Sequence, residues 1–452
     1  MSVSSTDLGA GARSHPQTDV SKDELLRRAA FASFIGTFVE WFDYAVYGFL
    51  AAVIAVVFFP ATDARSGLMA AYAVFALSFI IRPIGGVIWG HFGDKFGRKA
   101  TLSLSIFIMS AATFVIAFLP SYETAGMLAP ILLLLTRMVQ GFAASGEFAG
   151  AASFLAEYAP DNRRGFFTSL VPAGEAAGLL AASLFVALLY ALLSDAQLQS
   201  WGWRLPFLMA FPLGFVGVFI RRRLEETPHF QALEQENHVP TTPVKELFKN
   251  NFPQLMMAFG GTLLNAVGFY LILIYMPTYL AGELGVGKEA AFLCSTVTLV
   301  AYLGSIFIMG ALSDKLGRKV ILLLCSVLFV VLTVPLFMVL SSITYTGMAS
   351  TSYLMILMVL ALFGVMMAMN GGTLATFLCE LFPTRVRFSG FALSYNSANA
   401  FFGGTAPLIA TWVGGIIGSA LAPAYFLTGA AIITFLSIMM ARAGGAGSKL
   451  EE

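Results

Sequence analysis

The sequence GHFGDKFGRKATL, residues 90–102, joins two long apolar segments through a short polar turn, and it returns as GALSDKLGRKVIL at residues 310–322. A second pair, EYAPDNRRG from Glu157 and ELFPTRVRFSG from Glu380, recurs at nearly the same offset. Two motifs that recur with one spacing indicate a duplicated structural unit. The repeat therefore predicts a chain built from two similar halves.

Composition indicates that most of the chain lies in a membrane. Of the 452 residues, 58% are apolar and only 11% are charged, which does not fit a soluble protein with one core and a polar surface. The net charge of +1 gives no basis for nucleic-acid binding. A spanning helix needs about 20 mostly apolar residues. We expect twelve such helices, at residues 30–58, 67–91, 101–119, 127–157, 165–193, 203–220, 252–281, 289–312, 320–340, 352–379, 388–413 and 421–441.

The basic residues predict how these helices are oriented. Most of the 26 Lys and Arg residues fall on the side of the N-terminus, and the opposite loops keep only Arg65 and Lys288. Basic loops mark the cytoplasmic side, so both termini are expected in the cytoplasm of a bacterium, with the chain in its inner membrane as a monomer surrounded by lipid. The predicted parts are a tail (1–28), a six-helix half (29–220), a linker (221–251), a second six-helix half (252–441) and a tail (442–452). Paired repeats of this kind are typical of secondary transporters.

The repeated motifs carry charges on the predicted cytoplasmic side. Asp94 can lie at the positive N-terminal end of a neighbouring helix or pair with an arginine of the other half. For a single copy, solvated loop charges would be the better interpretation, but the repetition favours a gate that holds one conformation. The predicted gating residues are Asp94, Arg98, Glu157, Arg164, Asp314, Arg318, Glu380 and Arg387.

The first apolar segment, FIGTFVEWFDYAVYGFLAAVIAVVFFP at residues 34–60, holds Glu40 and Asp43 near its middle, and Arg137 and Glu175 fall at similar depth in later segments. A charge at the centre of a spanning helix costs about 2.5–3.5 kcal/mol. Four such groups are therefore expected to face one another or water. Three carboxylates against one arginine leave excess negative charge unless a proton is bound. We predict that Glu40, Asp43 and Arg137 couple transport to protons; the simpler alternative is that one carboxylate only pairs with Arg137 to join helices.

Polar and aromatic side chains at this depth are candidate substrate ligands. An arginine that receives a carboxylate, beside aromatic rings, suits a small metabolite with a carboxyl group. A zwitterion could place its ammonium against Glu175, whereas an organic acid would leave Glu175 to be neutralised by a proton, and both remain open. Arg82, in IIRPIGG, either guards the inner mouth, pairs with Glu147 or has a structural role. The predicted ligands are Trp41, Tyr44, Arg137, Glu175, Asn265, Tyr270, Asn370, Tyr395, Asn396 and Asn399.

No residue pattern indicates catalysis. Cys294, Cys325 and Cys379 lie in apolar stretches without metal-ligand spacing, and the four histidines are scattered. We therefore expect no enzyme activity, no metal and no cofactor other than the proton as coupling ion.

These motifs carry a resemblance to a known family. GHFGDKFGRK resembles the signature loop of the major facilitator superfamily, and RMVQGF at residues 137–142 resembles its proton-coupling motif. Six longer stretches are similar to the metabolite:H+ symporter family, which carries proline and betaine, 2-oxoglutarate, citrate or shikimate: VEWFDYAVYGF, IIRPIGGVIWGHFGDKFGRK, RMVQGFAASGEFAGAASFLAEYAP, SWGWRLPF, LEETPHF and YNSANAFFGGTAPLIATW.

The resemblance covers residues 29–440. It implies the all-α major facilitator fold, with twelve helices in two pseudo-symmetric halves, and proton-coupled import of a small carboxylate-bearing metabolite by alternating access. It also implies functional roles for Glu40, Asp43 and Arg137. Two alternatives stay open: a proton-driven exporter, and a sensor that binds a solute without transporting it.

Overall fold

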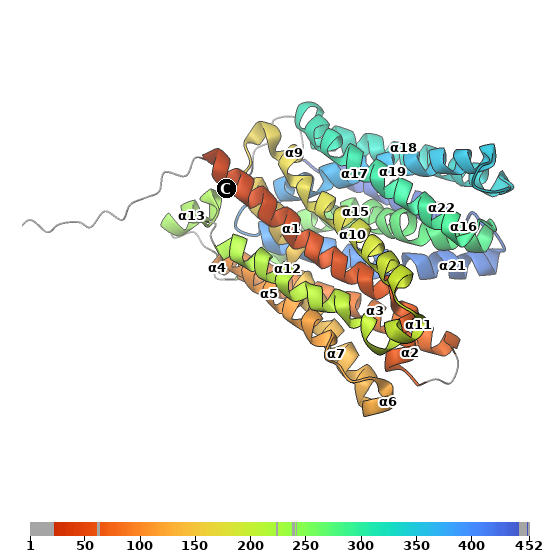
Figure 1. Cartoon of the computed structure of the whole chain (residues 1–452). Coiled ribbons are helices and arrows are strands. Elements are labelled where there is room, and N and C mark those ends of the chain that lie inside the picture. Colours follow the sequence, from red (N-terminus) through yellow and green to blue (C-terminus); the bar gives the residue numbers. More distant parts are fainter. Residues whose placement is uncertain are drawn as a thin grey trace, which may run out of the picture.

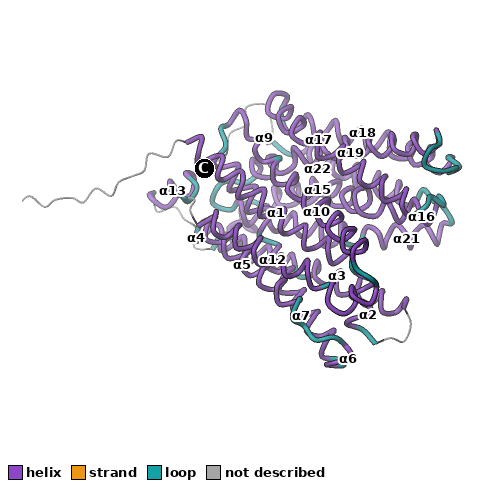
Figure 2. The backbone as a smooth tube through the Cα atoms, in the orientation of Figure 1, coloured by secondary structure: helices purple, strands orange, loops and turns teal. Residues whose placement is uncertain are grey.

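The computed structural model describes residues 22–60, 64–222, 225–236, 240, 242–442 and 450, and within these every regular element is a helix (Figure 2). Most of both predicted tails and part of the predicted linker lie outside the described residues. In the first predicted half the helices are α1 (Lys22–Phe49), α2 (Ala51–Phe58), α3 (Ala64–Ile80), α4 (Arg82–Phe96), α5 (Arg98–Ile116), α6 (Tyr122–Ala125), α7 (Leu128–Ala144), α8 (Glu147–Tyr158), η1 (Asp161–Arg163), α9 (Arg164–Thr168), α10 (Leu170–Leu192), α11 (Asp195–Gln197), η2 (Leu198–Gly202) and α12 (Arg204–Arg222).

Two short helices follow in the linker, and the second predicted half comes after them. The linker helices are α13 (Pro228–Gln235) and α14 (Pro243–Asn250). The remaining helices are α15 (Phe252–Gly268), η3 (Phe269–Tyr275), α16 (Met276–Glu283), α17 (Lys288–Leu316), α18 (Arg318–Ser342), α19 (Thr351–Leu381), α20 (Arg387–Ala398), η4 (Asn399–Gly403), α21 (Ala406–Ile417) and α22 (Ala422–Met440).

The twelve predicted spans are present as an all-helical membrane fold. Among the described residues, ten helical segments are long and apolar enough to cross a bilayer, and α1 with α2 forms an eleventh that bends by 67°. The segment predicted at 388–413 consists of α20, η4 and α21, and a turn at Gly404 and Thr405 interrupts it.

The distribution of side chains is that of a protein surrounded by lipid. Large apolar residues such as Phe107, Leu135 and Val331 are exposed on the outside, whereas Glu40 and Arg137 are buried. A soluble protein rarely exposes so much apolar surface while burying charges. The chain is therefore a multi-pass membrane protein.

Both copies of the repeated motif turn at a glycine with a positive φ. Gly97 has a φ of +99° between α4 and α5, and Gly317 has a φ of +96° between α17 and α18. Residues with a Cβ atom avoid this region because the side chain clashes with the backbone. The spacing D-K-x-G-R-K therefore forms a very short turn between two spans, as predicted.

Glycines also allow helices of the two halves to touch. A Cβ atom at Gly90 would meet the backbone of Ser389 on α20, and one at Gly310 would meet the carbonyl oxygen of Gly165 on α9. In line with this, α4 packs on α20 and α17 packs on α9. These contacts lie toward the end of the bundle that carries α13, called here the α13 end (Figure 1).

Candidate functional site

Asp94 joins the two halves at the α13 end. Its carboxylate accepts hydrogen bonds from the backbone N–H groups of Phe388 (3.1 Å) and Ser389 (2.8 Å), in the first turn of α20. The first N–H groups of a helix have no partner within the helix, and the helix dipole favours a negative charge there. Asp94 thus occupies the helix N-terminus that the sequence predicted for it.

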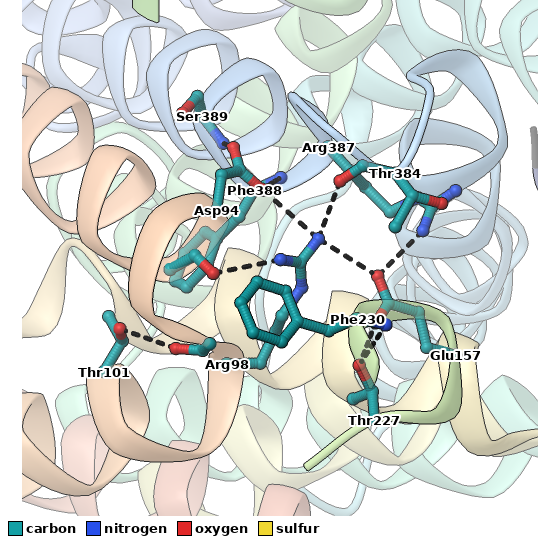
Figure 3. Close-up of polar contacts among 12 residues, drawn as sticks. Asp94, Arg98, Thr101, Glu157, Thr227, Phe230, Thr384, Arg387, Phe388 and Ser389 are labelled. Atoms are coloured by element: carbon teal, nitrogen blue, oxygen red, sulfur yellow. Dashed lines mark hydrogen bonds and ion pairs between the residues drawn. The ribbon is translucent and has the colours of Figure 1, made fainter. Parts of the chain in front are cut away.

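Arg98 connects Asp94 to a second buried carboxylate (Figure 3). Its Nη2 atom lies 3.3 Å from Asp94 Oδ1 and 3.4 Å from Glu157 Oε1, and it donates to the carbonyl oxygen of Thr384 (2.8 Å). Arg387 donates from the other half to the same Glu157 oxygen at 2.8 Å. Because Arg98 and Arg387 are completely buried, these pairs are shielded from the water and salt that weaken surface ion pairs.

The second motif copy builds the same arrangement. The carboxylate of Asp314 accepts from the two backbone N–H groups that follow Arg164 in α9, at 2.8 and 2.9 Å. Arg318 lies 2.8 Å from Asp314 and 3.3 Å from Glu380, which also pairs with Arg164 at 3.5 Å. The structure thus brings all eight predicted gating residues together in two related networks.

Sequence reasoning missed a segment that supports the first network. Residues 225–235, called here the linker strap, lie between the two halves in the chain. The carboxylate of Glu226 accepts from the backbone N–H groups of Arg98 and Lys99, both at 3.1 Å, and so caps the start of α5. Burial raises the pKa of the Glu226 carboxyl group, although these hydrogen bonds oppose the shift.

The next residues of the linker strap reach the charges themselves. The hydroxyl of Thr227 donates to Glu157 at 2.5 Å and also accepts from the backbone N–H of Phe230, which caps α13. The ring of Phe230 lies 5.1 Å from the guanidinium carbon of Arg98. The signal in the sequence was LEETPHF: a threonine before a proline is typical of a helix start.

In the middle of the bundle, Glu40 forms an ion pair with Arg82. The distance between Glu40 Oε1 and Arg82 Nη2 is 3.0 Å, and both residues are buried. The guanidinium carbon of Arg82 lies 4.6 Å from the ring centres of Tyr44 and Phe79. Arg82 therefore belongs to the central charged layer, which the prediction had placed it outside.

The predicted pair between Arg82 and Glu147 is wrong. Glu147 instead pairs with Arg221, the second-last residue of α12. Both terminal nitrogens of Arg221 donate to the Glu147 carboxylate, Nη1 at 2.9 Å. Arg221 also donates to the carbonyl oxygen of Leu102 at 2.9 Å. Glu147 is thus paired with a residue that the prediction assigned to the linker, and Arg82 pairs with Glu40 instead.

Asp43 and Arg137 are linked through other side chains. The hydroxyl of Thr113 donates to Asp43 at 2.8 Å and accepts from the side-chain amide of Gln140 at 2.8 Å, and Arg137 donates to Gln140 at 2.5 Å. The guanidinium carbon of Arg137 lies 4.2 Å from the ring centre of Tyr47. Among the described residues Arg137 makes no direct ion pair with either carboxylate, so the simpler alternative of a direct pair is wrong; Thr113 and Gln140 join Asp43 to Arg137 instead.

Aromatic residues of both halves meet beside the Glu40–Arg82 pair. The ring of Trp41 lies 4.8 Å from that of Phe269 and 6.3 Å from that of Tyr270, and Tyr270 packs edge-on against Phe79 at 5.7 Å. Asn265 is buried one turn earlier in α15. Trp41 and Tyr270 therefore stand where the two halves meet, as substrate ligands must.

Glu175 enters this group from α10. It is buried and interacts electrostatically with Glu40 and Arg82. It also interacts with Tyr302 and Tyr395, both from the second half. Among the described residues, neither Glu175 nor Asp43 forms a direct ion pair, whereas Glu40 pairs with Arg82; Glu175 is the one of the two that interacts with residues of the second half.

The predicted asparagines divide into two kinds. Asn396 donates to the carbonyl oxygen of Ser145 at 2.7 Å, and Asn399 donates to that of Tyr395 at 2.9 Å. Neither side-chain polar atom of Asn370 has a hydrogen-bond partner among the described residues, although Asn370 is fully buried. A buried polar group usually has a partner, so Asn370 is better placed than Asn396 or Asn399 to bind a ligand.

Comparisons with known proteins give the family. The family model of the Major Facilitator Superfamily matches residues 33–407 and 258–446. The glycine betaine/proline/ectoine/pipecolic acid transporter OusA of Dickeya dadantii is 38% identical over 92% of this chain and 83% of its own length. The proline/betaine transporter of Escherichia coli K12 is 37% identical over the same shares, and a putative proline/betaine transporter of Staphylococcus aureus is 34% identical over 94% of this chain and 90% of its own length.

Solved structures agree with the fold. The proton:xylose symporter XylE, solved with 6-bromo-6-deoxy-D-glucose, superposes with a TM-score of 0.80 over 96% of this chain and 99% of XylE, at 16% identity. XylE from E. coli in a partially occluded, inward-open conformation gives a TM-score of 0.67 over 92% of this chain and 96% of its own. With these matches along nearly its whole length, the chain belongs to the major facilitator superfamily and is a membrane transporter, not an enzyme.

Proposed function

We propose that this chain imports a small carboxylate-bearing osmolyte, of the proline and betaine kind, together with protons by alternating access. The substrate class is supported by the relatives, which are named as transporters of such solutes. The observation that carries the proposal is the central layer, where a buried Glu40–Arg82 pair adjoins Trp41, Tyr270 and Glu175. An arginine suits the carboxylate of a zwitterion, while aromatic faces and a carboxylate suit its ammonium.

Counting charges in this layer supports proton coupling. Glu40, Asp43 and Glu175 are buried, and two arginines, Arg82 and Arg137, lie among them. Two positive charges cannot neutralise three carboxylates, and an uncompensated buried charge is costly. At least one carboxyl group therefore binds a proton in this conformation. Each proton that enters down a potential of 100 mV contributes about 2.3 kcal/mol to accumulation.

The two networks at the α13 end would act as the gate. They join the halves at one end only, so they stabilise the conformation that is closed there. Their opening would require loss of the Asp94 and Asp314 hydrogen bonds to α20 and α9. In the proposed orientation this end is cytoplasmic, with both termini inside and the chain in the inner membrane.

Uptake into proteoliposomes tests the proposal. The purified full chain would be given an inward proton gradient and labelled proline, glycine betaine, 2-oxoglutarate, citrate or shikimate in parallel. The matched control is Glu40→Gln/Asp43→Asn, which removes both carboxylates while keeping their shape.

We expect proline or betaine to accumulate, and accumulation to collapse with an uncoupler and in the control. Uptake of an organic acid alone would contradict the osmolyte assignment. Accumulation that ignores the uncoupler would contradict proton symport, and faster loss of preloaded solute under the same gradient would indicate an exporter.

A further inference from the structure

The two arginines of the central layer have different surroundings. The Arg137 guanidinium lies over the rings of Tyr44, Tyr47 and Phe75 and donates to Gln140, all in the first half. It is completely buried. Arg137 is thus enclosed within one half, away from the surface where a solute must contact both.

Arg82 lies where the halves meet. It interacts electrostatically with Tyr270 from the second half as well as with Glu40, and with Tyr395 of α20. In its ion pair with Glu40, the Nη2 atom of Arg82 lies 3.0 Å from Glu40 Oε1. Arg82 Nε and Glu40 Oε2 have no hydrogen-bond partner among the described residues. The pair is therefore incomplete, since guanidinium and carboxylate usually form two parallel hydrogen bonds.

We propose that Arg82 binds the carboxylate of the substrate and that Glu40 competes with the substrate for this guanidinium. The inference rests on the proposed function and adds to it the residue that links substrate to proton. When a substrate carboxylate replaces Glu40 on Arg82, Glu40 is left unpaired in a buried site and takes up a proton. When the proton leaves Glu40, its carboxylate returns to Arg82 and displaces the substrate.

This exchange keeps Arg82 paired, and Glu40 either paired or neutral, at each stage. Before binding, Arg82 is neutralised by Glu40; after binding, it is neutralised by the substrate, and Glu40 is a neutral acid. Leaving either charge buried and unpaired would be strongly unfavourable. The ammonium of a zwitterion would then lie against Glu175 and the Trp41 ring. Binding of substrate and of proton are therefore linked through one guanidinium, and each must favour the other.

Other charges around Glu40 do not take over this role. Glu147, the next carboxylate toward the α13 end, is held by Arg221, and Asp43 is bonded to Thr113. The titratable and charged groups that interact with Glu40, on all elements packed against it, are Asp43 on α1, Arg82 on α4, Glu147 on α8, Glu175 on α10, Tyr270 on η3 and Tyr395 on α20.

Equilibrium binding of labelled glycine betaine and proline to the purified full chain, measured from mildly acidic to alkaline pH, tests the proposal. In the wild type we expect affinity to fall as pH rises, because ionised Glu40 competes for Arg82. Glu40→Gln should bind at alkaline pH as tightly as the wild type does at acidic pH, and without pH dependence. A purely structural role of Glu40 would not raise affinity.

Arginine variants separate the two candidates for the carboxylate. Arg82→Gln should lower affinity by about tenfold to a hundredfold, as expected for loss of a charge-assisted hydrogen bond, and bring betaine down to the level of choline, which has no carboxylate. Arg82→Lys should recover part of the affinity because it keeps the charge but not the planar donor pair. The double variant Glu40→Gln/Arg82→Gln, which buries no new unpaired charge, should bind as weakly as Arg82→Gln.

Arg137→Gln is the matched comparison, since sequence reasoning gave the substrate carboxylate to Arg137. A larger loss of affinity in Arg137→Gln than in Arg82→Gln would overturn the proposal, as would a Glu40→Gln protein that binds no tighter at alkaline pH. Failure of the proposed function would look different: the wild type itself would bind neither osmolyte, and the inference would fall with it.

Discussion

Asp94→Asn is expected to open the α13 end. The substitution keeps the size of the side chain but removes the negative charge from the N-terminus of α20. Asp94 accepts two backbone hydrogen bonds across the halves, from Phe388 and Ser389, and lies 3.3 Å from Arg98. An asparagine oxygen can keep one of these bonds as a neutral hydrogen bond, while its amide nitrogen faces the second N–H group.

The size of the effect follows from these contacts. A hydrogen bond to a charged group contributes about 1.5–3 kcal/mol, and the interaction of a carboxylate with a helix N-terminus adds about 0.3–1 kcal/mol. Loss of one bond and of the charge therefore weakens the closed conformation by about 2–4 kcal/mol. That corresponds to a shift of about thirtyfold to several hundredfold toward the open conformation.

Double electron–electron resonance, which measures the distance between two spin labels, would detect this shift toward the open conformation. Asn162 and Lys315 are exposed, lie on η1 and α17 of opposite halves, and sit at the α13 end away from Asp94 itself. The label pair Asn162→Cys/Lys315→Cys would be placed on a chain whose three buried cysteines are replaced. We expect a short distance in the parent and a longer one in Asp94→Asn.

Asp195→Asn is the matched control, because Asp195 is exposed and lies in α11, at the other end of the bundle. It should leave the distance unchanged. The reasoning would be refuted if Asp94→Asn kept the short distance while remaining folded, or if the control lengthened it equally.

Four further outcomes are expected. Gly90→Leu should also lengthen the label distance, because a side chain there meets the α20 backbone. Arg221→Met should lower the free energy of unfolding by about 3–5 kcal/mol, seen as a lower unfolding temperature, because it leaves Glu147 buried without its partner. Adding Glu147→Gln should recover part of this loss. Thr227→Val should lower the free energy of unfolding by about 1.5 kcal/mol, measured as a lower unfolding temperature, because it removes the hydrogen bond to Glu157. Thr227→Ser keeps the hydroxyl and should not lower it. Burial raises the pKa of the Glu226 carboxyl group above its usual 4.5, so the folded chain binds this proton more tightly than the unfolded chain does. As the pH rises from about 4.5 through the raised pKa, the unfolding temperature of the wild type should therefore fall relative to that of Glu226→Gln.

The members of the two networks at the α13 end could be predicted from the sequence because they occur twice. Repetition identified Asp94 and Asp314 as positions worth comparing, and their chemistry left few partners at a membrane surface. The linker strap could not be found in this way. Thr227 and Glu226 occur in one copy only, and nothing along the chain shows that they lie against Arg98.

The central layer was predicted in its members but not in its pairs. Helical spacing places Glu40, Asp43 and Arg137 at similar depth, yet depth alone does not determine which helix faces pack against one another. Arg82 was placed too near the cytoplasmic end, as a possible guard of the inner mouth, within one continuous predicted span at residues 67–91. In the structure Pro83 is in the first turn of α4, where proline is tolerated, so Arg82 starts a helix in mid-membrane.

The symmetry of the chain is kept in the networks at the α13 end and lost in the central layer, and a physical reason connects the two. When the two halves separate at one end, each half loses the same kind of contact with the other. Duplicated Asp–helix and Arg–Glu contacts can therefore hold both networks together. A small solute with a carboxylate at one end and an ammonium at the other is itself asymmetric. A site for the proposed zwitterion would therefore need charges such as Arg82 and Glu175 in one half, facing uncharged rings such as Tyr270 and Tyr395 in the other. A charged group at the equivalent depth of the second half would have to be neutralised as well, and would weaken the proposed coupling of substrate to protons.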